Sequence, residues 1–327
     1  MRQVAMPNLT ARRVFAALFA SVVVVSSASA VIPGSERNAL ISLYNSTNGD
    51  SWGANANWCN GACPASGTPV FNAAGSECTW YGISCDSGQS HVTAVGLSSN
   101  NLTGTLPALS ALSNLQYFAI VSNHVAGSIP ALSGLGQLQT FYVADNQLSG
   151  SIPSLSGLVK LGDFSVANNR LTGAIPSLAG LAGLYSFSAA ANQLSGTVPS
   201  LAGLSALRAF NVSGNSLSGA IPTLPGGLFD LEVEDNQLTG ALPAVSGAEL
   251  HHVDVGANRL SGGVPAASSS LYTPLAFAPS ILCPNGLSTS PSANDAGWNL
   301  ATGSAPWWAT PYPSNRCDDI FTDRFGP

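Results

Sequence analysis

The feature that most limits what this chain can fold into is a motif of the form N-x-L-x-G-x-I-P, which recurs through more than half of its 327 residues. Its glycines are separated by 23 residues five times and then by 21 and 22. A fixed interval of this length indicates structural units that stack on one another. The eight glycines are Gly104, Gly127, Gly150, Gly173, Gly196, Gly219, Gly240 and Gly262.

Ahead of each asparagine of the motif, apolar residues alternate with small or polar ones, as in Phe164 and Val166. Alternation with a period of two predicts a short strand that has one buried face. Because such a short strand cannot bury that face within one unit, neighbouring units must share a continuous core. The asparagine amide offers donors and an acceptor to backbone groups of the turn that follows. These residues therefore form a scaffold, with no acid, base or nucleophile among them.

The motif resembles that of the plant-type leucine-rich-repeat family, which includes receptor ectodomains and polygalacturonase-inhibiting proteins. The segments "ERNALISLYNSTNGDSW" (36–52) and "CTWYGISCD" (78–86) resemble the N-terminal cap of the same family. This resemblance implies an α/β solenoid, a curved right-handed superhelix with a parallel concave β-sheet and a disulfide-tied N-terminal cap. The spacing itself gives eight repeats of about 23 residues, and a disulfide-tied C-terminal cap is predicted from Cys283, Trp298, Trp307, Trp308 and Cys317. Ser35 is expected to cap the helix of the first segment.

The first thirty residues have the composition of a secretory signal. Arg2, Arg12 and Arg13 precede the apolar run 14–25, and small residues at 28–30 suit cleavage. We therefore predict an exported, extracellular chain, and association with the cell surface is compatible with this prediction. The predicted divisions are a signal peptide (1–30), an N-terminal cap (31–91), leucine-rich repeats (92–265), a C-terminal cap region (266–317) and an acidic-aromatic tail (318–327).

The cysteines cluster near the two ends of the chain. Their even number in an exported protein predicts structural disulfides. Several pairings are possible, and proximity along the chain favours Cys59 with Cys63, Cys78 with Cys85, and Cys283 with Cys317. Zinc ligation by the first four is an alternative.

Two sequence features could suggest an enzyme. "GDSWG" (49–53) matches the G-x-S-x-G nucleophile motif, but that motif requires a strand-turn-helix in an α/β sheet, whereas this match follows the expected cap helix. His251 and His252 are adjacent and lack the spacing of a metal-binding helix. We therefore predict no catalytic residue, no metal site and no cofactor.

The charge of the chain restricts its partners. Removal of residues 1–30 leaves seven basic against sixteen acidic residues, a formal charge of −9. This balance argues against nucleic acid and anionic membranes as partners. We expect positions six, four, two and one before each asparagine to face the concave side. The partner-binding residues predicted from these positions are Tyr117, Tyr142, Asp163, Asp230, Glu232, Glu234, Asp235, His252 and Asp254.

The function predicted from these features is non-enzymatic recognition of another extracellular protein through the concave face. Like charges on adjacent strands destabilise a sheet, so the acidic residues from Asp230 to Asp254 suggest a basic partner or an ion. One alternative is a carbohydrate or cell-wall binding module that uses the small, flat middle of the face. Another is a structural surface protein without a specific ligand.

Overall fold

The computed structural model describes residues 31–63, 68–245, 249–272, 280–290, 292–303, 305 and 307–308. The chain divides into two compact units, Met1–Ala30 and Val31–Pro327, and only the second contains described residues. The predicted signal peptide, the predicted tail and Cys317 lie outside the described residues.

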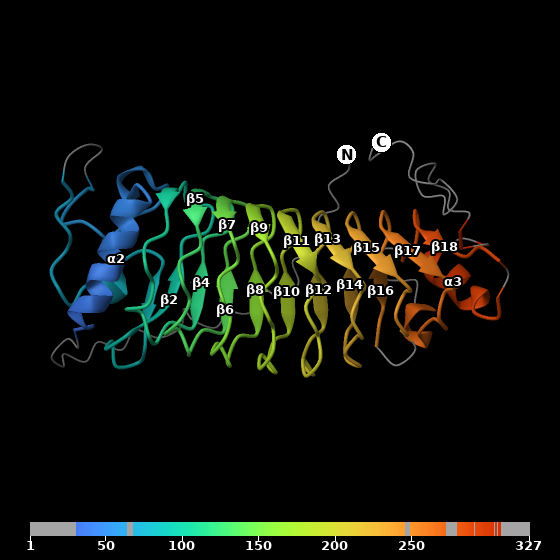
Figure 1. Ribbon diagram of the computed structural model, residues 1–327. Helices are drawn as coiled ribbons and strands as arrows, with labels where there is room; N and C mark the ends of the chain where they lie inside the picture. Colours follow the sequence, from blue (N-terminus) through green and yellow to red (C-terminus); the bar gives the residue numbers. More distant parts are fainter. Residues whose placement is uncertain are drawn as a thin grey trace. The chain divides into compact units, whose positions relative to one another are not determined.

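Each repeat contributes one strand to each of two sheets, so that the chain forms a stack of parallel coils (Figure 1). We call the first of these the concave sheet. Its β1–β2 pair is antiparallel and all later neighbours are parallel and in register, for example Phe141 with Phe164. Its strands in order are β1 (Ile83–Cys85), β2 (Val92–Gly96), β4 (Tyr117–Ala119), β6 (Thr140–Tyr142), β8 (Asp163–Ser165), β10 (Ser186–Ser188), β12 (Ala209–Asn211), β14 (Asp230–Glu232) and β16 (His252–Asp254).

The second sheet is built from the motif itself, where we predicted only turns. In each copy the residue two positions after the asparagine is buried; it is leucine in every copy but one, which has Val125. Residues beside it pair with the next coil, and the strand ends at the glycine or one residue after it. Gly150, for example, has a φ of +76°, which a residue with a side chain adopts only at a cost. Its strands are β3 (Thr103–Thr105), β5 (His124–Ser128), β7 (Gln147–Gly150), β9 (Arg170–Gly173), β11 (Gln193–Thr197), β13 (Ser216–Gly219), β15 (Gln237–Gly240), β17 (Arg259–Gly262) and β18 (Gly286–Leu287).

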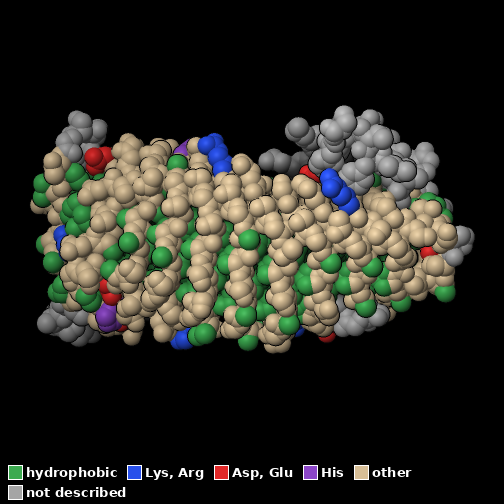
Figure 2. All heavy atoms as spheres, in the orientation of Figure 1, with side chains coloured by type: hydrophobic (Ala, Val, Ile, Leu, Met, Phe, Trp, Pro, Cys, Tyr) green, Lys and Arg blue, Asp and Glu red, His purple; other side chains and the backbone are tan. Residues whose placement is uncertain are grey.

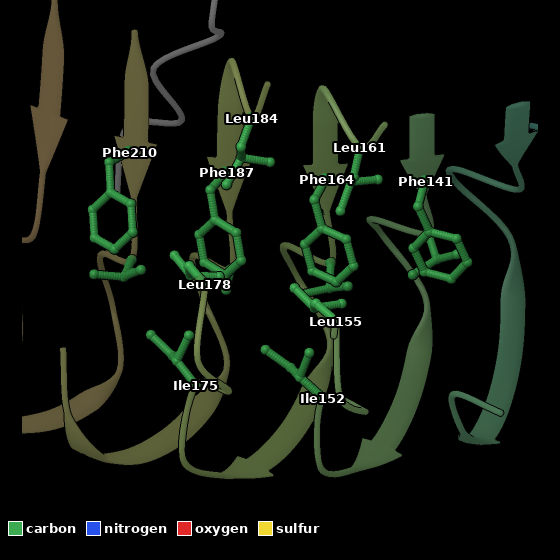
Figure 3. Packing of buried hydrophobic residues seen from close by; sticks show 14 of the residues in the cluster. Phe141, Ile152, Leu155, Leu161, Phe164, Ile175, Leu178, Leu184, Phe187 and Phe210 are labelled. Atoms are coloured by element: carbon green, nitrogen blue, oxygen red, sulfur yellow. The ribbon is translucent and has the colours of Figure 1, made fainter. Parts of the chain in front are cut away.

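The core lies between the two sheets and runs continuously through the coils. Phenylalanines at equivalent positions stack along it, with ring centroids 5.4 to 5.6 Å apart (Figure 3). Because each ring packs on the rings of the neighbouring coils, no coil completes its own core, as the repeat predicts. The stacked rings are Phe118, Phe141, Phe164, Phe187 and Phe210, all at most 1% exposed.

The asparagines form a ladder that joins neighbouring coils. The Nδ2 group of Asn169 donates to the carbonyls of Val143 (3.0 Å), Val166 (3.1 Å) and Ala167 (3.1 Å). Its Oδ1 accepts a hydrogen bond from the backbone N–H of Leu148, at 2.8 Å. Val143 and Leu148 belong to the preceding coil, so the amide closes its own turn, as predicted, and also ties two coils together.

The N-terminal cap contains the helix α2 (Gly34–Ser46) and the 3-10 turns η2 (Gly49–Ser51) and η3 (Glu77–Thr79). The expectation that Ser35 caps α2 is wrong. The residue before the helix is Pro33, whose carbonyl accepts the N–H groups of Glu36 and Arg37, and Ser35 lies within the first turn.

Disulfides join Cys59 to Cys63 and Cys78 to Cys85, as proximity predicts, which excludes zinc ligation by these four cysteines. The G-x-S-x-G match falls in η2, where Gly49 packs beneath the ring of Tyr44. It is a turn of the cap and not a strand-turn-helix.

At the other end of the coils lie the 3-10 turn η4 (Ser269–Tyr272) and the helix α3 (Asp295–Thr302). Trp298 of α3 is fully buried, and its Nε1 donates to the carbonyl of Pro265 in the last repeat, at 2.8 Å. The helix therefore covers the end of the core. The third predicted disulfide involves Cys317 and lies outside the described residues.

Candidate binding face

Three acidic residues of the predicted site, Asp230, Glu232 and Asp254, lie on two neighbouring strands of the concave sheet, and Glu234 follows the first of these strands. In β14, Leu231 points into the core while Asp230 and Glu232 face the other side, and in β16 His252 and Asp254 flank the buried Val253. Asp230 pairs with His252 and Glu232 with Asp254. We call Asp230, Glu232, Glu234, His252 and Asp254 the acidic cluster.

Such a concentration of charge is unusual in this chain, because Asp, Glu, Lys and Arg together make up only 8% of it. Figure 2 shows one side of the molecule, on which charged side chains are sparse and uncharged groups form most of the surface.

The carboxylates of the acidic cluster are only partly compensated by hydrogen bonds. His252 Nδ1 lies 2.9 Å from Asp230 Oδ1. Asn211 Nδ2 donates to the Glu232 carboxylate, and the N–H of Gly256 donates to Asp254 Oδ1 at 3.1 Å. Glu234 Oε2 is buried and has no hydrogen-bond partner among the described residues.

The electrostatics of the acidic cluster follow from this arrangement. Burial, with the charges of Asp230 and Glu234 added, raises the pKa of Glu232 to about 7. Burial, with the charge of Asp254 added, raises the pKa of Glu234 to about 8. Burial also raises the pKa of Asp254, to about 6. The cluster therefore retains protons near neutral pH that isolated carboxyls would have lost.

His252 responds in the opposite sense to its surroundings. Burial lowers its pKa, but the hydrogen bond to Asp230 and the charges of Asp230, Asp254 and Glu232 outweigh burial, so that the pKa of His252 is raised. A protonated His252 is then the cation that partly offsets the cluster.

Asp235, which we grouped with these residues, is placed apart from them. It occupies the left-handed turn after the strand, with a φ of +54°, and its side chain is exposed. It lines a depression of about 240 Å³ together with Asn215, Asn236 and Gln237. The residue directly before each ladder asparagine therefore sits at the rim of the concave sheet.

The second predicted group lies nearer the N-terminal cap. The rings of Tyr117 (β4) and Tyr142 (β6) meet edge to face, with centroids 6.5 Å apart. Burial raises the pKa of both tyrosines, and the charge of Asp163 (β8) adds to the shift at Tyr142. Burial likewise raises the pKa of Asp163. We call Tyr117, Tyr142 and Asp163 the tyrosine group.

Between the two groups the face carries small side chains, among them Ser165, Ser186 and Ser188. Four strand steps separate β6 from β14 in the sheet order. At about 4.8 Å per step, the tyrosine group and the acidic cluster lie about 19 Å apart.

A further row of side chains was missed. It occupies the position seven residues before each ladder asparagine, just ahead of the concave strands. The rings of Phe229 and His251 stack there with centroids 4.0 Å apart, and Arg208 Nη1 donates to the carbonyl of Gly227 at 2.6 Å. Tyr185, in the same row, is 50% exposed. Reading this column of the repeat, which turns aromatic and basic from Tyr185 onward, would have found it.

No helix in the described part of the chain has the length and apolar character needed to cross a membrane. No protein-family model and no curated protein sequence matches the chain.

Solved structures do match it. One is the leucine-rich-repeat ectodomain of the plant membrane receptor kinase GASSHO1/SCHENGEN3 from Arabidopsis thaliana in complex with CASPARIAN STRIP INTEGRITY FACTOR 2, at 26% identity and a TM-score of 0.55. The match covers 69% of this chain and 31% of that one. Another is PEPR1–AtPEP1, at 26% identity and a TM-score of 0.53, covering 71% of this chain and 36% of that one. This chain thus spans about a third of the length of each.

Proposed function

We propose that this chain, which is similar to plant leucine-rich-repeat ectodomains, is a non-enzymatic recognition protein that binds an extracellular peptide or protein along its concave sheet. The similar GASSHO1/SCHENGEN3 ectodomain is in complex with a named factor, which supports a binding role for the fold. The match covers a third of that ectodomain, so the nature of the partner has to be argued from this chain's own residues.

The observation that carries the proposal is the acidic cluster. Asp230, Glu232 and Asp254 share two adjacent strands and face one side, which costs stability because like charges repel. A partner that brings Lys or Arg side chains would relieve this repulsion and would be steered towards the cluster. The occupant we propose is therefore a basic segment.

The tyrosine group supplies a second contact of different chemistry. Tyrosines with a half-buried ring and a polar tip are common anchors at protein interfaces. An extended peptide that crosses the strands advances about 3.3 Å per residue, so about six residues span the 19 Å between the tyrosine group and the acidic cluster. The preferred ligand would carry apolar or aromatic side chains at one end of such a segment and basic ones at the other.

Carbohydrate is the second candidate, and one observation favours it. Tyr185 is half exposed beside the small, hydroxyl-bearing stretch that includes Ser186 and Ser188. An aromatic ring next to hydroxyl groups offers an apolar surface with polar groups around it, which suits a sugar ring. Binding on glycan arrays that is lost in Tyr185→Ala would favour this candidate.

Affinity capture from extracellular fractions, with the purified protein as bait, tests the peptide or protein proposal. The critical variant neutralises the cluster with Asp230→Asn, Glu232→Gln and Glu234→Gln. The matched control, Thr172→Lys, Ser195→Lys and Ser218→Lys, makes the same change in net charge at exposed positions of the second sheet.

We expect the neutralised bait to lose partners that both wild type and control retain. Equal capture by all three baits would remove the acidic cluster from the proposal.

A further inference from the structure

We propose that Asp230, Glu232 and His252 form a binding site for a divalent metal ion of the zinc class on the concave sheet. A zinc-class ion is indicated because imidazole nitrogen with carboxylate oxygen is a donor set that suits zinc and related transition metals, whereas magnesium and calcium prefer oxygen alone. Metal binding at this site requires no protein partner, so it can be tested independently of the proposed function.

The donor atoms of the three side chains lie close together. One ligand atom from each of the three side chains lies within 4.8 Å of the other two. Ligands on a tetrahedral zinc ion lie about 3.4 Å apart when the bonds are about 2.1 Å, so a closure of at most about 1.4 Å is needed. Asp230 and His252 already lie in register on adjacent strands and touch at 2.9 Å, so small rotations of the side chains suffice.

The three side chains are partly exposed to solvent and partly enclosed by the sheet. The His252 side chain is 13% exposed and that of Asp230 is 35% exposed. An ion can therefore reach the donors from solvent, while the sheet beneath holds them in place. Three protein ligands leave one position of a tetrahedral ion for water or for another group.

A fourth side chain, that of Glu234, also favours a cation at this place. Glu234 follows Glu232 at the next position facing the same side, and its Oε2 is buried without a hydrogen-bond partner among the described residues. A buried carboxylate oxygen that lacks a donor is costly unless a cation or a proton compensates it. A metal ion between Asp230 and Glu232 would supply that positive charge.

The hydrogen bond between His252 and Asp230 agrees with this inference. It requires a proton between the two side chains, and a metal ion would take the place of that proton. Binding should therefore release protons and strengthen as the pH rises.

The test is isothermal titration calorimetry of the untagged protein with Zn²⁺ alone at pH 8 and at pH 5.5, followed by measurement of bound metal after dialysis. We expect one saturable site per chain at pH 8, weaker binding at pH 5.5, and a binding enthalpy that varies with the ionisation enthalpy of the buffer. His252→Gln and Glu232→Gln should each abolish the saturable site. Circular dichroism and the melting temperature establish that each variant is folded.

Two control variants distinguish a specific Zn²⁺ site from non-specific binding of Zn²⁺ to exposed carboxylates and histidines. Asp145→Asn removes an exposed carboxylate from the rim of the concave sheet, and His124→Gln removes an exposed histidine from β5. Both should bind Zn²⁺ like the wild type. The inference is overturned if the wild type shows no saturable binding at pH 8, if folded His252→Gln or Glu232→Gln still binds, or if Asp145→Asn loses binding as completely as they do.

Discussion

Replacement of Asn169 by leucine tests the bonding that holds neighbouring coils together. The substitution removes three donated hydrogen bonds and one accepted one, at a side chain that is 9% exposed. The Leu148 N–H loses its acceptor inside the structure, and the carbonyls of Val143 and Val166 lose a donor. One buried group left unpaired costs about 1–3 kcal/mol. Since the carbonyls can find other donors more readily than the N–H can find another acceptor, we expect the free energy of unfolding to fall by about 3 kcal/mol.

The assay is urea denaturation followed by circular dichroism, with hydrogen exchange to locate the loss. Arg170→Leu is the control, because it introduces the same side chain at the neighbouring, exposed position. The control should change the free energy of unfolding by no more than about 0.5 kcal/mol. Exchange in Asn169→Leu should rise first in the coils on either side of residue 169. A loss no larger than that of the control would refute the role given to the ladder.

Further predictions concern the acidic cluster, the cap and the core. In buffer with a chelator, the pKa values of about 7 for Glu232 and about 8 for Glu234 lie above their ordinary 4.5, so the folded protein binds more protons than the unfolded one in that interval. The free energy of unfolding should therefore fall as the pH rises from about 4.5 to about 8, with each of the two carboxyls contributing at most ~1.4 kcal/mol per pH unit. Glu232→Gln/Glu234→Gln should reduce this dependence relative to wild type and leave the part due to Asp254 and His252, whose pKa values are also raised, and an identical pH profile in the two proteins would contradict it. Reduction of Cys59–Cys63 and Cys78–Cys85 should increase hydrogen exchange in the N-terminal cap before residues 160–200, and the reverse order would show that the disulfides do not hold the cap. Phe164→Ala should lower the free energy of unfolding by about 3–5 kcal/mol in urea melts, since it opens a gap in a stacked column, and a loss below about 1 kcal/mol would mean that the neighbouring rings close it.

The repeat made the coils and the concave strands predictable, and the proximity of the cysteines along the chain made the first two disulfides predictable. Phe164 and Val166 alternate with polar residues, and alternation fixes which face of a strand is buried. The second sheet was not predictable in the same way. Its strands contain at most one buried residue each, such as Leu148 in Gln147–Gly150, and their pairing depends on the stacking of neighbouring coils.

The candidate site shows the same limit. The spacing of Asp230 and Asp254 from their asparagines correctly places them on adjacent strands and one face. It does not reveal how deeply a side chain is enclosed by residues some twenty positions away. Glu234 looks like a solvated carboxylate in the sequence, yet one of its oxygens is buried without a partner among the described residues. Asp235 looks like its neighbour in the cluster, yet the left-handed turn directs it to the rim.

The central claim is that the concave sheet binds a segment with a basic end at the acidic cluster and an apolar end at the tyrosine group. The most direct measurement is biolayer interferometry, in chelator, of synthetic peptides that carry two arginines about six residues from two aromatic residues, with scrambled peptides of equal composition beside them. Binding should favour the ordered peptides, weaken from 0.05 to 0.5 M salt because screening shortens to a few ångströms, and be lost in the Asp230→Asn, Glu232→Gln, Glu234→Gln variant. Binding that is indifferent to peptide order, to salt and to this variant would contradict the claim.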